Sequence, residues 1–168
     1  MPFGTAPTSF TAFISPSHDV DGWLWGAAPV VQLPTISSST LVSSVWGAGP
    51  STAMVYSGGP WVAGVLVNNI FALGGTPGPS GNSYSSFLAN PFVAYNFDDG
   101  WYLSSAPNIT ANWQASGTKW TVPIGGGGGR VFRIGTQPVD LSVSVYYNAI
   151  RPTFGSYWQL STQLTFVF

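Results

Sequence analysis

The sequence predicts an all-β protein: one domain, residues 1–168, folded as an antiparallel, up-and-down transmembrane β-barrel of about 8–10 strands. Three observations predict it. Charged residues make up only 5% of the chain, several segments alternate polar and apolar residues with a period of two, and tryptophans lie near the predicted strand ends. Helices are disfavoured, because 21 glycines and 14 prolines are spread along the 168 residues.

The charge deficit restricts what the protein surface can face. A soluble domain carries about a quarter charged residues, whereas this chain has 4 Lys and Arg, 5 Asp and no Glu. Disorder is excluded by a hydrophobic content of 45%. A net charge of −1 offers no basic surface, so nucleic acid is not expected as a partner. We therefore expect the exterior to face membrane lipid or other copies of the chain.

Strand-like composition recurs along the whole sequence. The nine predicted strands cover residues 8–14, 23–33, 45–57, 61–73, 84–97, 101–114, 119–134, 139–150 and 157–168. Most are longer than the five or six residues typical of soluble strands, and they suit tilted membrane strands. The best apolar run, residues 61–73, is too short for a spanning helix and is interrupted by Asn68 and Asn69.

Alternation is clearest near the C-terminus. One face of segment 139–150 carries Val139, Leu141, Val143, Val145 and Tyr147, and the other carries Asp140, Ser142, Ser144, Tyr146 and Asn148. The last segment places Trp158, Leu160, Leu164, Phe166 and Phe168 opposite Gln159, Ser161, Gln163 and Thr165. The polar faces hold Ser, Thr, Asn, Gln and Tyr rather than the Lys and Glu of a water-facing surface. This favours an enclosed polar interior with an apolar exterior.

Turn residues set the predicted registers. A three-residue loop, Asp98–Gly100, places Phe97 opposite Trp101, and the same register places Asn96 opposite Tyr102 and Asn90 opposite Asn108. Around Gly135, similar reasoning predicts Arg133 opposite Asp140, as a cross-strand ion pair on the polar face.

Prolines conflict with this strand assignment. They fall near the middle of five predicted strands, at Pro29, Pro50, Pro91, Pro107 and Pro123. Each one removes a backbone N–H from a ladder, so we expect bulges or other strand boundaries at these places.

A series of short motifs in the C-terminal half resembles a known family. In order, they are Asp99-Gly100-Trp101-Tyr102, Thr110-Ala111-Asn112-Trp113, Trp120-Thr121-Val122-Pro123-Ile124, Arg130-Val131-Phe132-Arg133-Ile134-Gly135, Gln137-Pro138-Val139, Tyr146-Tyr147-Asn148, Arg151-Pro152 and Trp158-Gln159-Leu160. This part of the chain is similar to the outer-membrane family named for the meta-pathway of phenol degradation, whose members are often labelled "transporter" or "neuromedin U". The resemblance is strongest over residues 90–168.

The resemblance implies a β-barrel of the Gram-negative outer membrane that acts as a channel for aromatic or other hydrophobic compounds. The chain would be the C-terminal part of a larger family barrel, without its N-terminal strands. The expected partners are membrane lipid, small solutes and the outer-membrane assembly machinery, which would recognise the C-terminal strand ending at Phe168.

Candidate site residues are those predicted to line the interior of the barrel. They are Asn90, Tyr102, Asn108, Asn112, Lys119, Arg133, Asp140, Tyr146, Asn148, Gln159 and Gln163. Passage would be passive, with selectivity set by pore width and by the charges of Lys119, Arg133 and Asp140.

No catalytic residue, metal ligand or cofactor is predicted. The single histidine, His18, lies with Asp19 and Asp21 in a sequence typical of a turn, and cysteine and glutamate are absent. The glycine run at residues 125–129 is expected to give room to facing side chains or to let a strand bend. Arg130 falls on the outward face, which leaves two alternatives: a bulge turns it inward, or it reaches the membrane interface.

The eight tryptophans are interpreted as two aromatic girdles of a membrane barrel. The alternative is a non-transporting structural or self-assembling β-protein, which includes a truncated or designed barrel whose interior is plugged by Tyr102, Tyr146 and Phe92.

Overall fold

The computed structural model describes residues 8–35, 44–76 and 85–166, which form a single antiparallel sheet of ten strands without an α-helix. The strands are β1 (Thr8–Thr11), β2 (Trp23–Leu33), β3 (Ser44–Gly58), β4 (Trp61–Thr76), β5 (Ser85–Asn96), β6 (Trp101–Ser105), β7 (Ile109–Asn112), β8 (Trp120–Ile134), β9 (Gln137–Ile150) and β10 (Trp158–Phe166). A 3-10 turn, η1 (Asp98–Gly100), separates β5 from β6. The all-β, up-and-down antiparallel prediction is confirmed.

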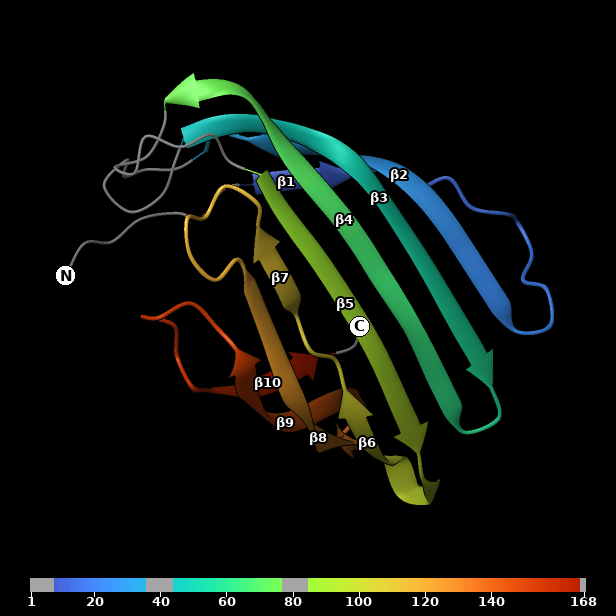
Figure 1. The fold of residues 1–168 in the computed structure, drawn as a ribbon. Helices are drawn as coiled ribbons and strands as arrows, with labels where there is room; N and C mark the ends of the chain where they lie inside the picture. The colour runs from blue at the N-terminus through green and yellow to red at the C-terminus, as the bar shows by residue number, and fades with distance from the viewer. Residues whose placement is uncertain (1–7, 36–43, 77–84, 167–168) are drawn as a thin grey trace.

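The strands follow one another in the sheet in sequence order, and β6 and β7 both lie between β5 and β8. The sheet is curled: β2 to β5 form one long wall, and β8 to β10 turn away from it (Figure 1). Among the described residues no ladder joins β1 to β10, so these two strands are the edges of the sheet. No helix in these residues has the length and apolar character needed to cross a membrane.

The nine predicted segments correspond closely to the strands, with one exception. The sixth segment is split into β6 and β7, because Ala106-Pro107-Asn108 interrupts the ladder. Pro107 has no N–H to donate, and the break occurs where that donor is missing. Phe168, the predicted recognition residue of the last strand, lies outside the described residues, and β10 ends at Phe166.

The prolines lie where the ladders are already interrupted. Pro29 pairs with Pro50, and the β3–β4 ladder omits Gly49 and Pro50. Pro91 lies in β5 beside the break between β6 and β7 that contains Pro107. Pro123 adjoins a register shift between β8 and β9. The missing donors are therefore concentrated at a few breaks in the sheet.

The connections define two ends of the sheet. Three tight turns lie at one end, which we call the tight-turn end: Gly59-Pro60, η1 and Gly135-Thr136. Gly59, Gly100 and Gly135 adopt positive φ there, as such turns require. The connection at residues 12–22 also reaches this end and is held along β2 by bridges at Ile14 and Val20. The opposite end, the loop end, carries the connections at 113–119 and 151–157; residues 36–43 and 77–84 lie outside the description.

One predicted register is confirmed and one is wrong. Asn96 pairs with Tyr102, and the Phe97 N–H donates to the Trp101 carbonyl, as the three-residue loop requires. Arg133, however, pairs with Pro138, and Asp140 pairs with Val131. The turn contains only Gly135 and Thr136, so β9 begins two residues earlier than predicted and the ion pair between Arg133 and Asp140 does not form.

Candidate functional site

The two faces of the sheet differ in chemistry along β9. Leu141, Val143 and Val145 are 42%, 46% and 44% exposed, whereas Tyr146 and Asn148 are buried. The predicted alternation is therefore confirmed, with apolar side chains on the outer face and polar ones on the inner face. Val139 is the exception on the outer face: it is only 1% exposed, because the register places it between Phe132 and Phe166.

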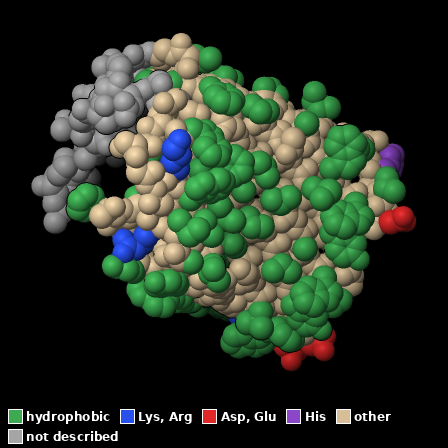
Figure 2. Space-filling model, in the orientation of Figure 1, with side chains coloured by type: hydrophobic (Ala, Val, Ile, Leu, Met, Phe, Trp, Pro, Cys, Tyr) green, Lys and Arg blue, Asp and Glu red, His purple; other side chains and the backbone are tan. Residues whose placement is uncertain are grey.

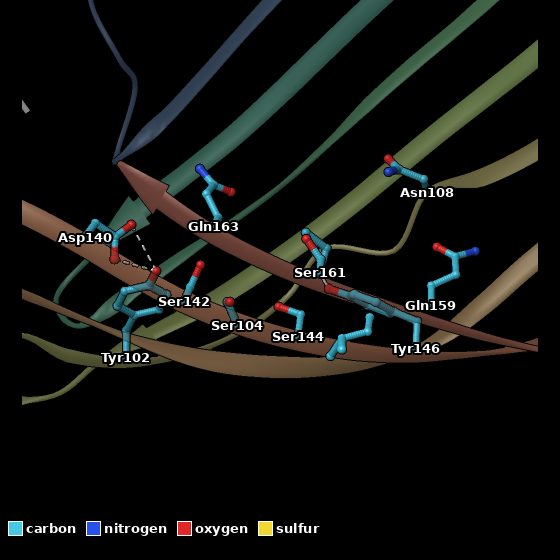
Figure 3. A pocket seen from close by; sticks show the side chains of 12 residues that line it. Tyr102, Ser104, Asn108, Asp140, Ser142, Ser144, Tyr146, Gln159, Ser161 and Gln163 are labelled. Atoms are coloured by element: carbon cyan, nitrogen blue, oxygen red, sulfur yellow. Dashed lines mark hydrogen bonds between the residues drawn. The ribbon is translucent and has the colours of Figure 1, made fainter. Parts of the chain in front are cut away.

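The inner face of the C-terminal strands encloses a polar pocket of about 470 Å³ (Figure 3). Its lining is formed by Tyr102, Ser104, Ala106, Asn108, Asp140, Ser142, Ser144, Tyr146, Gln159, Leu160, Ser161 and Gln163. Hydroxyl and amide groups dominate, and Asp140 is the single charged residue in the set. Such a lining can exchange hydrogen bonds with a polar solute and disfavours an anion.

The side chain of Tyr102 extends from β6 along the inner face, over β8, to β9. Its hydroxyl donates to both carboxylate oxygens of Asp140, at 2.9 Å to Oδ1 and 3.1 Å to Oδ2. The strand between them, β8, contributes Gly129 at this level, and a Cβ there would collide with the Tyr102 ring. Because Gly129 has no side chain, the Tyr102 ring can lie against β8 on the inner face of the sheet.

Tyr146 makes a similar crossing in the opposite direction. It starts on β9, paired with Gly125 of β8, and its hydroxyl accepts a hydrogen bond of 3.0 Å from the Ala106 N–H. That donor lies in the break between β6 and β7, where no ladder bond satisfies it. Ser105 completes the contact by donating to the Gly125 carbonyl at 2.6 Å. We call Tyr102 and Tyr146 the tyrosine straps.

Close approach of β9 and of one strap accounts for the inward glycines of the run. Gly125, Gly127 and Gly129 face inward, and a Cβ at Gly127 would lie 2.5 Å from the Ser144 Cα. At Gly125 a Cβ would lie 2.8 Å from the Tyr146 Cα. The glycines allow close approach to β9 and leave room for the strap at Gly129, as the sequence predicts.

Amides extend the polar surface on both sides of the pocket. The Asn90 side chain donates to Asn108 Oδ1 at 3.0 Å and to the Pro107 carbonyl at 3.1 Å, which confirms that Asn90 lies opposite Asn108. Asn148 accepts from Gln159 at 2.8 Å and donates to the Ser156 carbonyl at 2.7 Å, which fixes the connection before β10.

The candidate interior residues are not all brought together. Six line the pocket: Tyr102, Asn108, Asp140, Tyr146, Gln159 and Gln163. Asn90 and Asn148 hydrogen-bond to members of this set. The other three lie elsewhere. Asn112 accepts from the Gln114 N–H in a turn, Lys119 is exposed in the connection before β8, and Arg133 is exposed beside the tight turn.

Four serines of the pocket are missing from the candidate set: Ser104, Ser142, Ser144 and Ser161. The signal that locates them is the period of two, because Ser142 and Ser144 lie between Asp140 and Tyr146 on one face of β9. Serine is so common in turns that its presence alone does not distinguish an interior position from a loop.

The tryptophans lie at both ends of the sheet and on its outer face. Trp23 and Trp25 begin β2, while Trp61 and Trp101 begin β4 and β6, all at the tight-turn end. Trp46, Trp113, Trp120 and Trp158 lie at the loop end. Neighbouring rings contact one another within each group, as in Trp61 with Tyr95 at 4.7 Å and Tyr147 with Trp158 at 5.0 Å between centroids. We call these groups the two aromatic belts.

Arg130 points outward, since it pairs with Trp101 on one side and Leu141 on the other. The only register shift in the β8–β9 ladder lies at Val122 and Pro123, so no bulge near Arg130 turns it inward. Its guanidinium carbon lies 5.2 Å from the centroid of the Trp101 ring, within the belt of the tight-turn end.

The segment around His18 forms an exposed turn. The His18 Nδ1 lies 2.9 Å from the Ser17 hydroxyl, and Asp19 accepts from the Gly22 N–H at 3.1 Å. Within the described ranges, no group of three His or Asp side chains could hold a metal ion.

Comparison of the chain with protein-family models, curated proteins and solved structures found no significant match. The resemblance to the phenol meta-pathway family therefore stays a prediction from the sequence motifs.

Proposed function

We propose that the protein is a β-barrel protein of the outer membrane of a Gram-negative bacterium, with its outer face in contact with lipid. The observation that carries this proposal is that the large apolar side chains lie mostly on the surface, the reverse of their distribution in a soluble protein. Among the described residues the buried apolar side chains are few, and most of them are Ala or Val, whereas Leu160, Leu164 and Phe166 are 73%, 56% and 49% exposed. Hydrophobic side chains cover much of the face in Figure 2, and acidic ones lie only along its edge.

Many apolar side chains on the outer face would be exposed to water in a soluble protein. Leaving a Val, Leu or Phe side chain in water instead of burying it forfeits about 1.5–3 kcal/mol. On the outer face a part of this loss would recur on several strands, for example at Val31, Leu103, Leu141 and Val143, which are 39–59% exposed. A protein that is only marginally stable needs another apolar phase to cover such a surface. Hydrocarbon chains supply that phase.

The spacing of the aromatic belts supports a membrane. On β8, Trp120 and Arg130 mark the two belts and are ten residues apart. Ten residues of strand extend about 33 Å, which at a tilt of about 45° spans about 23 Å. An outer-membrane barrel has an apolar band about 25 Å tall between its aromatic girdles.

We further propose passive passage of small, largely uncharged solutes along the polar inner face. The pocket supports this function, because its hydroxyls and amides can replace water around a solute in several successive positions. Both straps are held against the wall by hydrogen bonds, so they line the pocket instead of crossing it. The sequence resemblance adds aromatic or other hydrophobic compounds to the proposed solutes, and it adds the outer-membrane assembly machinery as a partner of the C-terminal strand.

Purification and electrical recording test the two parts separately. We expect the protein to require detergent, to migrate differently on a denaturing gel before and after heating, and to conduct in a planar lipid bilayer. A protein that stays monomeric in buffer without detergent would contradict the membrane assignment. A heat-modifiable, membrane-inserted protein without any conductance would contradict passage alone.

A second candidate function is self-assembly, which the open edges of the sheet favour. The register places β1 and β10 in the same direction, so an antiparallel ladder cannot join them directly. Unpaired strand edges are sites where other chains add. Large particles that form without detergent, and that contain only this chain, would support assembly over the membrane proposal.

A further inference from the structure

An apolar groove lies on the outer face of the sheet at the tight-turn end. It has a volume of about 400 Å³ and is lined by Trp101, Gly128, Gly129, Arg130, Phe132, Leu141 and Val143. Gly128 forms its floor: it has no side chain, and a Cβ there would lie 3.0 Å from the Tyr102 carbonyl oxygen and 3.2 Å from a Leu103 methyl. The remaining walls are an indole, a phenyl ring and two aliphatic side chains. A groove of this shape and chemistry fits a hydrocarbon chain.

Arg130 is the one charge on the groove. Arg130 is exposed, its guanidinium carbon lies 5.2 Å from the centroid of the Trp101 ring, and no Asp carboxylate of the described residues lies within 4.0 Å of it. Asp98 and Asp99 are the nearest acids in sequence to Trp101, and they form the adjacent turn η1. The cation–π contact holds the guanidinium beside the groove, and its N–H donors can bind an anion bidentately.

We propose that this groove binds one anionic phospholipid, with an acyl chain along Gly128 and the headgroup phosphate on Arg130. The inference rests on the proposed function, because it requires the outer face to lie in lipid. Charge complementarity identifies the occupant: an apolar groove alone accepts any acyl chain, but an unpaired arginine at one end favours a phosphate headgroup whose net charge is negative. Arg130 lies in the aromatic belt, the level at which lipid headgroups meet hydrocarbon.

Native mass spectrometry of the detergent-solubilised full chain tests the proposal. The protein is incubated with equal amounts of phosphatidylglycerol and phosphatidylcholine that have identical acyl chains, and with inorganic phosphate in a separate sample. We expect a single phosphatidylglycerol adduct that is favoured about tenfold over phosphatidylcholine, because the choline cation of phosphatidylcholine offsets the charge of its phosphate and is repelled by Arg130. No adduct is expected with inorganic phosphate, because it cannot fill the groove.

Variants assign the preference to the guanidinium. Arg130→Gln should abolish the preference for phosphatidylglycerol, and Arg130→Lys should keep part of it, since lysine retains the charge but not the planar, bidentate donor group. Arg133→Gln is the matched control: it removes an equal charge from the same strand and the same end, but from the opposite face, and should retain the full preference.

Two results would overturn the proposal: an Arg130→Gln protein that prefers phosphatidylglycerol as strongly as the wild type, or a wild type that retains both lipids equally. Heat-modifiable migration is recorded for every variant, so that loss of folding is not mistaken for loss of binding. If the heat-modifiable, detergent-dependent wild type shows no lipid preference, the lipid site fails and the membrane proposal stands. If the wild type needs no detergent, both proposals fail.

Discussion

The inner faces of two parts of the sheet differ, although their outer faces are alike. Along the inner face of β2, Leu24 at the start of the strand is 42% exposed, and the positions that follow, Gly26, Ala28, Val30 and Gln32, are all buried. Along β9 and β10 the inward positions carry hydroxyls, amides and the Asp140 carboxylate around the pocket. Both parts present Val, Leu and aromatic side chains outward. The outer face is thus apolar in both parts. The inner face of β2 is buried and mostly lined by small residues, whereas that of β9 and β10 is polar and lines the pocket.

The difference predicts that a charge costs more on the inner face of β2 than on that of β10. Val30 is only 2% exposed, so Val30→Asp would bury an unpaired carboxylate and should lower the free energy of unfolding by about 3 kcal/mol or more. Ser161→Asp, at an exposed pocket position, should change it by less than about 1 kcal/mol. Urea unfolding of the reconstituted variants, followed by tryptophan fluorescence, measures both values. Equal losses at the two sites would remove the distinction between the two inner faces.

The Tyr102 strap should be the next most sensitive feature. Tyr102→Phe removes the hydroxyl that donates to both oxygens of Asp140, and should cost about 1–3 kcal/mol, the usual loss when a charged group loses its hydrogen-bond partner. Tyr147→Phe is the control, because Tyr147 lies on the outer face and contacts Trp158 through its ring. The same unfolding experiment compares them. A loss at Tyr147 as large as that at Tyr102 would show that the strap has no special role.

Asn90 lies at the boundary between the two parts of the sheet. Its side chain donates to acceptors in the break between β6 and β7, so Asn90→Ala should lower the free energy of unfolding by about 1 kcal/mol. Asn90→Asp, which cannot donate to the Pro107 carbonyl, should be at least as destabilising at neutral pH. Hydrogen exchange of residues 105–109 should increase in both variants, and unchanged protection would contradict the proposed contribution of Asn90.

The smallest effect should be on ion selectivity. Asp140→Asn removes the one charge of the pocket lining, and should shift the reversal potential in a salt gradient away from cations without abolishing conductance. Asp98→Asn is the control, since Asp98 lies in the turn η1 outside the pocket. An identical reversal potential in the wild type and in Asp140→Asn would exclude Asp140 from the conduction path.

The local sequence pattern predicted which segments form strands. The features that it did not predict, a register and the partners of several side chains, depend on contacts between distant segments. Alternation in β9 and β10 correctly assigned Leu141 and Ser142 to opposite faces, because the period of two depends only on neighbouring residues. The register of the β8–β9 hairpin was wrong, because Pro138 reads as a turn residue and instead lies in the strand. Four further prolines lie inside β2, β3, β5 and β8; the sequence predicts irregularities there, but it does not predict which neighbouring ladder is interrupted.

The sequence predicted several residues of the pocket but not the hydrogen bonds between them. Tyr102 and Asp140 were both assigned to the interior, but their hydrogen bond spans β8 and depends on the register of two ladders and on Gly129 between them. The pairing of Tyr146 with the Ala106 N–H likewise required the break at Pro107, which the predicted sixth strand did not contain. Contacts across three strands combine several registers, so an error in any of them changes the partner.

The central claim is that the outer face of the sheet lies in lipid and the inner face encloses a polar space. The chain has no cysteine, so single cysteines can be introduced at residues 141–145 of β9 and spin-labelled in the vesicle-reconstituted protein. Oxygen, which partitions into hydrocarbon, should relax the labels at positions 141, 143 and 145, and a polar nickel reagent should favour those at 142 and 144. Labels that show no alternation, or the opposite one, would contradict the account.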